Sequence, residues 1–237
     1  MNLSIIIPIA PKELCWKLLV NDLIEYFELD KSISAEILIV GAESDDCSSI
    51  SKELKLLKTS LPMRCVQSLP SRAKQMNKGA QLAEGEYLWF LHADSRVGTR
   101  AISKLAKYIV THDQALTYFN LLFLKDGPLL MWLNVIGVWW RSHIKGLPFG
   151  DQGFCMPKKV FFKDLNAYDE NVVKAEDHAL IWQARAKKIS VKPLAAFLYT
   201  SARRYQEQGW WKTTRWHRQL TRDQIKDFQC RYNNKVN

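Results

Sequence analysis

The stretch Ser71–Ser95, SRAKQMNKGAQLAEGEYLWFLHADS, predicts a helix, a strand and a ligand-binding acid in one unit. Ser71 can cap a helix, and small or apolar residues recur on one face of it: Ala73, Met76, Ala80 and Ala83. Gly85 stands where such a helix would end, and Tyr87–Leu91 is a short apolar run typical of a buried parallel strand. Asp94 comes just after that strand, at the edge of an α/β sheet where ligands bind.

The residues before this stretch alternate between strand-like and helix-like patterns. Strands are expected at Leu3–Ile7, Glu36–Val40 and Met63–Gln67, and helical stripes at 16–27, 50–57 and, after the stretch, 102–109. Repeated βα units are joined by right-handed crossovers and place their strands side by side in the same direction. The first half of the chain therefore predicts a largely parallel sheet.

The second half is more apolar and less regular. A long strand is expected at Ala115–Leu124, and helices at Glu176–Lys187 and Gly209–Lys226. The apolar stretch Pro128–Trp140 is shorter than the roughly 20 residues that cross a bilayer, so it predicts a buried or partly buried helix. Its three tryptophans, Trp132, Trp139 and Trp140, leave open an interfacial helix or an apolar wall for a ligand.

Composition indicates one domain with a sizeable core, because the chain has 237 residues and 47% of them are hydrophobic. The net charge of +10 is concentrated near the C-terminus, where six basic residues and one acid lie between Arg203 and Arg222 together with three tryptophans. That mixture suits an anionic membrane surface, a phosphate-bearing ligand or nucleic acid. A solvated helix face with a few packed tryptophans is the simpler alternative.

The five cysteines are scattered and form no C-x-x-C pair, so neither a zinc site nor a disulfide framework is indicated. The short apolar run at Leu3–Ile7 lacks the basic flank and the length of a signal peptide. We therefore expect a cytoplasmic protein, with attachment to the cytoplasmic face of the inner membrane as an alternative.

Five motifs follow one another along the chain. They are R-A-x-Q-M-N-x-G-A at 72–80, L-H-A-D-S at 91–95, G-D-Q-G at 150–153, E-D at 176–177 and T-S-A-R-R at 200–204. In this order they resemble a bacterial subgroup of the family-2 glycosyltransferases. The resemblance covers most of the chain. It implies an α/β GT-A-like fold, in which a mostly parallel twisted sheet is flanked by helices and followed by a C-terminal helical extension.

The resemblance also implies an activity. Enzymes of this kind move a sugar from a nucleoside-diphosphate sugar to a hydroxyl acceptor, with inversion and with a divalent metal. Residues 1–112 would form the nucleotide-sugar-binding half, residues 113–208 the acceptor and catalytic half, and residues 209–237 a basic C-terminal helix. The acceptor is not indicated, although a lipid-linked one would suit the tryptophan-rich segments.

Asp94 is the expected metal ligand. A diphosphate leaving group carries charge that a divalent cation neutralises, and Mg²⁺ or Mn²⁺ needs only one or two protein carboxylates. Asp94 is the single acid of its motif, because His92 replaces the first Asp of the common D-x-D, as it does in the subgroup. His92 is assigned to the donor site, either as a metal ligand or as a hydrogen-bonding neighbour. The simpler reading of Asp94 is a turn or helix-capping acid.

Asp177 is the expected catalytic base. In a helix beginning at Glu176 it shares a face with Leu180, Ile181 and Ala184, so its carboxylate would point inward at the favourable end of the helix dipole. A sugar-accepting hydroxyl must lose a proton, and the resemblance gives that role to Asp177 with Glu176 in support. A surface acid that only stabilises the helix end is the alternative.

The remaining candidates bind the donor or the acceptor. Gly150, Asp151 and Gln152 are assigned to the acceptor side by resemblance, with a tight turn before a strand at Phe154–Met156 as the alternative. Arg203 and Arg204 could clamp phosphate oxygens or merely form surface ion pairs. Arg72, Asn77 and Pro8 complete the expected donor site.

The chain departs from the family pattern in two places. The first loop is usually Pro-x-x-Asn-Glu, whereas Pro8–Glu13 lacks that pair in register. The second strand usually ends in Asp, where this chain has Gly41, although Ser44 and Asp46 keep the later positions. A catalytically idle sugar-nucleotide-binding protein is therefore an alternative to an enzyme. A nucleic-acid-binding protein is supported only by the charge and is not expected.

Overall fold

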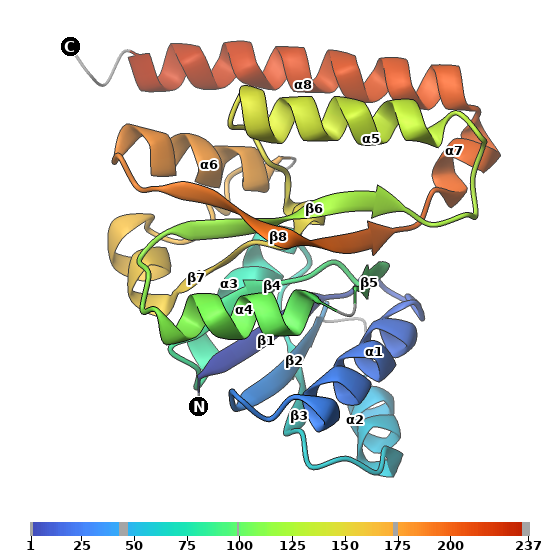
Figure 1. Cartoon of the computed structure of the whole chain (residues 1–237), viewed down its shortest axis with the longest axis vertical. Coiled ribbons are helices and arrows are strands. Elements are labelled where there is room, and N and C mark those ends of the chain that lie inside the picture. The colour runs from blue at the N-terminus through green and yellow to red at the C-terminus, as the bar shows by residue number, and fades with distance from the viewer. Residues whose placement is uncertain (1, 43–46, 99, 173–174, 234–237) are drawn as a thin grey trace.

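A single mixed sheet organises the molecule (Figure 1). The computed structural model describes residues 2–42, 47–98, 100–172 and 175–233, without the side chains of 220, 224 and 227–233. Ser44 and Asp46 lie outside the described residues. Within these ranges eight strands pair in the order β3-β2-β1-β4-β7-β6-β8-β5. The strands are β1 (Leu3–Pro8), β2 (Ala35–Gly41), β3 (Met63–Gln67), β4 (Tyr87–Phe90), β5 (Ser95–Val97), β6 (Leu116–Phe123), β7 (Cys155–Pro157) and β8 (Val191–Thr200).

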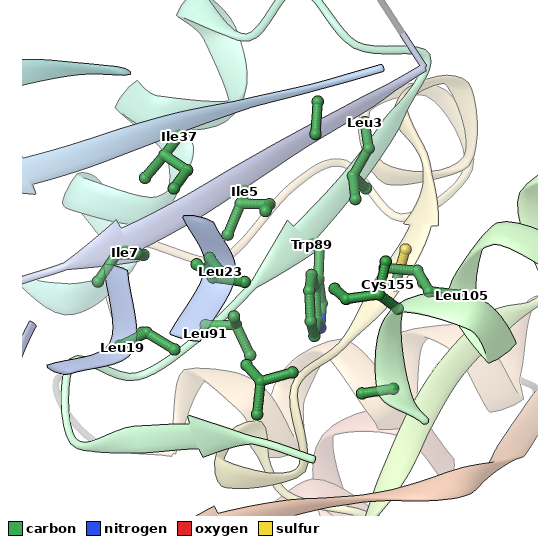
Figure 2. Close-up of a cluster of buried hydrophobic side chains, with 14 of the residues drawn as sticks. Leu3, Ile5, Ile7, Leu19, Leu23, Ile37, Trp89, Leu91, Leu105 and Cys155 are labelled. Carbon is green, nitrogen blue, oxygen red and sulfur yellow. The ribbon is translucent and has the colours of Figure 1, made fainter. Parts of the chain in front are cut away.

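Helices cover both faces of this sheet. They are α1 (Trp16–Leu29), α2 (Cys47–Leu56), α3 (Arg72–Leu82), α4 (Ala101–Val110), α5 (Met131–Trp139), α6 (Glu176–Ala186), α7 (Arg203–Gln208) and α8 (Trp210–Asn233), with short helical turns at 140–144, 150–152 and 160–164. One apolar cluster packs α1 and α4 against the sheet, and Figure 2 shows Trp89 and Leu91 at its centre. A second cluster packs α3 and α6 on the other face. The sheet therefore lies between two layers of helices, each packed on it through an apolar cluster.

The first four strands in the sheet order run parallel, as the sequence predicts. β1 pairs with β2 and β4, and β2 pairs with β3, all in the same direction. Six consecutive buried residues in β1 give the apolar run that a strand covered on both faces needs. The predicted helix within 71–95 ends at Leu82, three residues before Gly85, and the strand after it begins at Tyr87 as expected.

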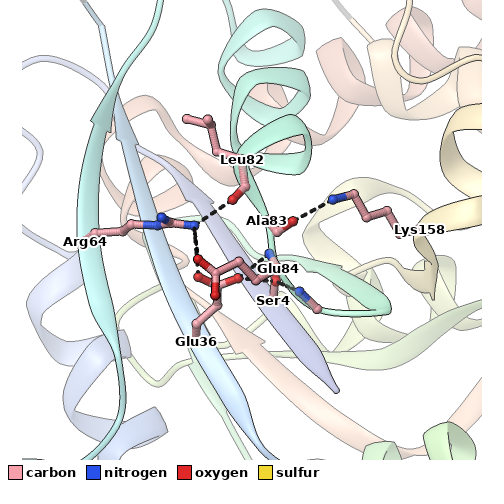
Figure 3. Close-up of polar contacts among 8 residues, drawn as sticks. Ser4, Glu36, Arg64, Leu82, Ala83, Glu84 and Lys158 are labelled. Carbon is pink, nitrogen blue, oxygen red and sulfur yellow. Dashed lines mark hydrogen bonds and ion pairs between the residues drawn. The ribbon is translucent and has the colours of Figure 1, made fainter. Parts of the chain in front are cut away.

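Polar side chains hold the amino ends of these strands (Figure 3). Ser4 Oγ donates to Glu36 Oε1 at 2.6 Å, and the backbone N–H of Glu84 donates to the same carboxylate at 2.6 Å. Arg64 bridges Glu36 and the carbonyl of Leu82 at 3.2 and 2.6 Å. A buried carboxylate is tolerated here because it is paired and hydrogen-bonded. This edge is thus filled, and the opposite, carboxyl edge is left for a ligand.

The second half of the sheet is mixed rather than parallel. β7 pairs antiparallel with β4 and with β6, and β5 pairs antiparallel with the end of β8. Because antiparallel partners place the end of one strand beside the start of the next, residues 150–153 before β7 lie beside residues 91–94 after β4. In the same way, the pairing of Ser95 with Thr200 places the segment after β8 beside Asp94. The sheet itself therefore brings three of the motifs to one edge.

The C-terminal helices form a layer above the second half of the sheet (Figure 1). The predicted helix at 128–140 is observed as α5, which continues as a π-helical turn through residues 140–144. Asn134 of α5 accepts a hydrogen bond from Trp210 Nε1 at 3.1 Å and donates to Thr214 Oγ1 at 3.4 Å, so α5 and α8 lie side by side. None of the described helices combines the length and the apolar character that crossing a membrane requires.

Candidate active site

Acidic residues from three parts of the chain converge at the carboxyl edge of the sheet. Asp94 follows β4, Asp151 lies in the turn before β7, and Glu176 and Asp177 begin α6. The negative charge of Asp94 contributes to raising the pKa of Asp151, and that of Asp151 contributes to raising the pKa of Asp177. The positive charge of Arg72, the first residue of α3, acts to lower the pKa of all three aspartates, Asp94, Asp151 and Asp177. The sequence-predicted candidates from four motifs thus share one electrostatic environment.

Asp177 is held directly against the glycine turn. Its carboxylate accepts a hydrogen bond from the backbone N–H of Gly150, while its Oδ1 has no partner among the described residues. A Cβ on Gly150 would stand 2.1 Å from Asp177 Oδ2, so only glycine permits this approach. The predicted inward face is confirmed, since Asp177, Leu180, Ile181 and Ala184 are all buried.

The start of α6 is set by a strained backbone. Ala175 precedes the helix with a φ of 66° in the left-handed region, which a residue with a Cβ rarely adopts. The carbonyl of Ala175 nevertheless accepts from the N–H groups of His178 and Ala179 at 3.0 and 3.2 Å, which begins the helix there. Such strain persists only where the surrounding structure determines it, and it is found at functional sites. Here it places Glu176 and Asp177 together at the sheet edge.

The pKa of Asp177 is raised to about 7. Burial is the largest cause because it penalises the ionised form, and the neighbouring Glu176 raises the pKa further. Arg72 acts in the opposite direction, and its Nε lies 3.9 Å from Glu176 Oε1. A carboxyl group with a pKa near neutrality can both accept and release a proton at physiological pH, as a general base must.

Asp94 and His92 offer the chemistry that a divalent cation needs. Asp94 is partly buried, and burial raises the pKa of its carboxyl group above the ordinary value. Burial, with Arg72, lowers the pKa of His92 well below its usual value, so the imidazole is neutral, and its Nε2 has no partner among the described residues. A carboxylate and an unpaired neutral imidazole, two positions apart along the chain, are groups that Mg²⁺ or Mn²⁺ can accept as ligands. The described side chains contain no group of three or more His, Cys, Asp or Glu residues that could hold a metal ion.

Asp151 is partly buried, and so is the arginine that acts on it, Arg141. Burial raises the pKa of its carboxyl group, which Arg141 and Arg72 oppose, and Oδ1 lacks a partner in the described part of the chain. Arg141 comes from the turn after α5, donates to the carbonyl of Leu147 at 3.1 Å and covers the Phe149 ring at 3.1 Å from its centroid. Burial lowers the pKa of Arg141 to about 10, so it stays charged and attracts the Asp151 carboxylate. Asp151 therefore faces the site with an incompletely hydrogen-bonded carboxyl group.

The T-S-A-R-R motif is fixed by an acid that the sequence does not single out. Asp126 accepts from Ser201 Oγ at 2.6 Å and from the backbone N–H of Ala202 at 2.8 Å. Arg203 then reaches toward the first loop, where it donates to Cys15 Sγ at 3.0 Å and acts electrostatically on Asp94. The positive charge of Arg204 acts instead to lower the pKa of Tyr205 and of His217. The two arginines thus serve different surroundings, and Arg203 is the one at the acid cluster.

Two of the predicted binding residues have protein partners in this structure, and a third is buried. The Asn77 side chain donates to the carbonyl of Tyr168 and to Glu170 Oε1 at 2.9 Å each, and accepts from the N–H of Tyr168 at 3.0 Å. Gln152 donates to the carbonyl of Phe119 at 3.0 Å and accepts from the N–H of Phe149 at 3.2 Å. Pro8 is buried at the end of β1. Asn77 and Gln152 therefore shape the site by holding backbone segments in place.

Two further residues reach the site without having been predicted from sequence. Glu13 lies in the loop after β1, where its negative charge acts to raise the pKa of Asp94 and of Arg203. Its position shortly after the first strand was the available signal, since that strand ends at the same edge as β4. Arg141 is the other, and its only signal is a lone charge next to the apolar stretch 128–140.

We expect Gly150→Ala to destabilise the fold and to reduce activity. The new methyl group would stand 2.1 Å from Asp177 Oδ2, so the carboxylate must move and lose its bond to the Gly150 N–H. Overpacking of this kind costs about 1–3 kcal/mol, which chemical denaturation measures. Gly137→Ala in α5 is the matched control, because a Cβ there meets nothing within 4 Å. The control should stabilise by up to about 1 kcal/mol; equal effects of both changes would contradict the close approach at Gly150.

Comparison with solved structures places the fold. Residues 1–349 of TarS from S. aureus, solved in complex with UDP-GlcNAc, match with a TM-score of 0.63 and 17% identity over 85% of this chain and 58% of that one. The complex of the same protein with UDP matches with a TM-score of 0.64 and 19% identity over 85% and 60% of the two chains. The chain therefore spans about three fifths of these TarS structures. No curated relative matches the sequence.

The family follows from the sequence model that matches this chain. Residues 4–166 match the family described as Glycosyl transferase family 2. That range contains the parallel half of the sheet, Arg72, Asp94 and the glycine turn with Asp151, and the shared α/β fold agrees with it. The chain therefore belongs to glycosyl transferase family 2.

Proposed function

We propose that this protein transfers a sugar from a nucleoside-diphosphate sugar to an acceptor hydroxyl with inversion at the anomeric carbon. The observation that carries the proposal is Asp177, a buried carboxylate with a pKa raised to about 7 and an unpaired Oδ1 at the acid cluster. Asp177 takes the proton of the acceptor hydroxyl as its oxygen bonds to the anomeric carbon. The bond to the diphosphate breaks in the same step, and the diphosphate leaves with the electron pair. One displacement of this kind inverts the configuration.

The surroundings of Asp177 support binding of an anionic donor. Arg72 and Arg203 supply positive charge beside Asp94, and guanidinium groups suit phosphate oxygens. Asp94, with His92 next to it, would hold Mg²⁺ or Mn²⁺, which supplies further charge to the leaving diphosphate. The UDP and UDP-GlcNAc in the TarS structures favour a uridine nucleotide as the first donor to test.

The acceptor side is formed by the glycine turn. Gly150 fixes Asp177, and Asp151 faces the same cluster with an unpaired oxygen. A hydroxyl that binds between these two carboxylates would lie within reach of the proposed base. A lipid-linked acceptor is the class that best suits the apolar helix α5, which leads into Arg141 and this turn.

Binding of donors by the unmodified protein is the direct test. UDP, UDP-sugars and other nucleoside-diphosphate sugars are added with and without Mn²⁺, and the unfolding temperature is measured. A donor at a hundred times its Kd should stabilise by about 2.7 kcal/mol, which corresponds to roughly 5–10 °C for a chain of this size. Absence of stabilisation by every donor with Mn²⁺ would contradict the proposal.

Turnover separates the enzyme from a protein that only binds. Gly41 leaves no side chain where the family pattern has an acid, and Pro8–Glu13 lacks the usual Asn-Glu pair. Both departures favour a catalytically idle binder. Release of the nucleoside diphosphate is measured for each donor that stabilises the protein. We expect slow hydrolysis to water even without the true acceptor, because Asp177 can also take a proton from water. Stabilisation without any release would support the idle binder.

A further inference from the structure

Helix α5 and the turn after it expose a continuous apolar face. Its members, which we call the α5 stripe, are Leu129, Trp132, Ile136, Trp139, Trp140 and Ile144, with exposed fractions between 48% and 96%. Successive members are mostly three or four residues apart, and such residues lie on one face of a helix. A contiguous exposed apolar face marks an interaction surface, whereas single exposed apolar residues do not.

The inner face of α5 packs against the helices α7 and α8. Met131 packs with Ala202 and Trp210 in a small buried cluster, and Asn134 is hydrogen-bonded to Trp210 and Thr214. The orientation of α5 is therefore fixed by α7 and α8. The α5 stripe cannot turn inward without breaking these contacts, so its exposure belongs to the folded state.

The charge around the α5 stripe is positive. Between Gly127 and Gly150 the chain contains no Asp or Glu, and Lys145 lies over the Trp140 ring at 4.4 Å. The neighbouring helix α8 carries no acid from Trp210 to Arg222, and the exposed basic residues within that range are Lys212, Arg215, Arg218 and Arg222. Trp211 and Trp216 are exposed beside them at 77% and 48%, whereas Trp210 packs inward. Apolar side chains, tryptophans and basic residues thus occur together on these two helices.

We propose that the α5 stripe docks on an anionic phospholipid bilayer, with the basic side chains of α8 against the headgroups. Tryptophan prefers the boundary between headgroups and acyl chains, and basic residues are drawn to anionic lipid. A second copy of the chain is a poorer occupant. A two-fold interface would place the basic α8 of each copy near the other, in molecules that each carry a net charge of +10.

The docked helix leads directly into the acceptor side of the site. Trp139 and Trp140 belong to the stripe, and the next residue, Arg141, points inward to Asp151 and donates to Gln152 Oε1 at 3.4 Å. A bilayer on the α5 stripe would therefore lie next to the segment that supports the glycine turn. That a lipid-linked hydroxyl is the acceptor rests on the proposed glycosyl transfer, whereas the docking itself does not.

Co-sedimentation with vesicles tests the docking on the full chain. Vesicles of phosphatidylcholine alone and of phosphatidylcholine with phosphatidylglycerol are compared at low and high salt. We expect binding to the anionic vesicles at low salt and a smaller bound fraction at high salt, because salt screens the basic residues. No preference for anionic vesicles at low salt overturns the proposal. Stabilisation by UDP-sugars, measured on the same preparation, reports separately on the proposed function.

The double variant Ile136→Ser/Trp139→Ser tests the stripe itself. Loss of two large apolar side chains from the membrane interface should lower the partition coefficient by about tenfold or more. Leu29→Ser/Leu56→Ser is the control, since these side chains are 78% and 80% exposed on other helices. The control should bind like the unmodified protein, and nucleotide stabilisation should persist in both variants as evidence of folding.

Two results with these variants would overturn the proposal. One is that the stripe variant partitions into anionic vesicles as well as the control does. The other is that, without lipid, the unmodified protein sediments as a dimer and the stripe variant as a monomer, while neither protein binds the vesicles. In that case the α5 stripe joins two copies of the chain.

Discussion

Asp177→Asn is expected to lower the rate of sugar transfer by about 10²-fold or more, as loss of general-base catalysis implies. The amide keeps the shape of the carboxylate and can still accept the hydrogen bond from the Gly150 N–H. It cannot take a proton from the acceptor. The measurement is the transfer rate at saturating donor, with donor affinity determined separately from thermal stabilisation. Unchanged donor affinity with a lost rate identifies the base, whereas a near wild-type rate means that the base lies elsewhere.

The same carboxylate should control the dependence of rate on pH. A base works only when ionised, so activity should fall as the pH drops through the pKa of Asp177, which is about 7. Burial is the main cause of the raised pKa and Glu176 is the next. Glu176→Gln removes that negative charge and should move the acid limb of the profile to lower pH. An acid limb that stays in place would show that Glu176 does not act on the titrating group.

The free energy of unfolding should depend on pH in the opposite way to activity, because it should fall as the pH rises. The ordinary pKa of the aspartate is 3.8, so between that value and about 7 the unfolded chain releases a proton that the folded protein retains. The folded state therefore loses stability as the pH rises through this window. Asp177→Asn should remove the loss and be more stable than the unmodified protein above neutral pH by on the order of 4 kcal/mol. Denaturation at pH values below and above the window measures it.

Asp94→Ala is expected to abolish the part of donor binding that depends on Mn²⁺. Asp94 is the carboxylate nearest the end of β4, beside the unpaired imidazole of His92. Without it a cation and the diphosphate lose their shared anchor, while Arg72 and Arg203 still attract the phosphates. Nucleotide stabilisation with and without Mn²⁺ separates the two contributions.

The control for Asp94→Ala is Glu28→Ala, which removes an exposed carboxylate from the outer face of α1. It should leave the Mn²⁺ dependence intact. A variant at Asp94 that keeps the full Mn²⁺-dependent shift would contradict the assignment of this residue to the metal.

Local patterns were enough to predict the parallel half of the fold. β1, β2, β3 and the helix–strand unit that ends at Phe90 appear where apolar runs and helical stripes indicate them. β1, β2 and β4 are recognisable alone because burial on both faces requires a continuous apolar run, whereas β3 is a partly exposed edge strand. β5 and β8 were missed for the opposite reason. β5 has three residues, and β8 has a partly exposed, interrupted pattern that includes Pro193, so neither shows the expected period.

The candidate site was predictable as a set of motifs but not as an arrangement. Asp94, Asp151 and Asp177 were found from sequence, and the antiparallel β7 explains why they meet. Asn77 and Gln152 were assigned to ligands because a motif shows only that a polar residue stands at a position. Their backbone partners, Tyr168 and Phe119, are far away in sequence and carry no pattern of their own. Glu13 was missed for the same reason, since its nearness to Asp94 depends on the packing of separate loops.

The bond between Arg203 and Cys15 has a consequence for how the molecule folds. It joins residues 188 positions apart. In the same way, β5 can pair only after β8, about a hundred residues later in the chain, has been synthesised. Contacts between distant residues form late, because closing a long loop costs chain entropy before the contact compensates for it. The four parallel strands can collapse early, while Arg203 reaches the acid cluster only when nearly the whole polypeptide is present. A nascent chain still on the ribosome would hold a formed half-sheet and no competent site.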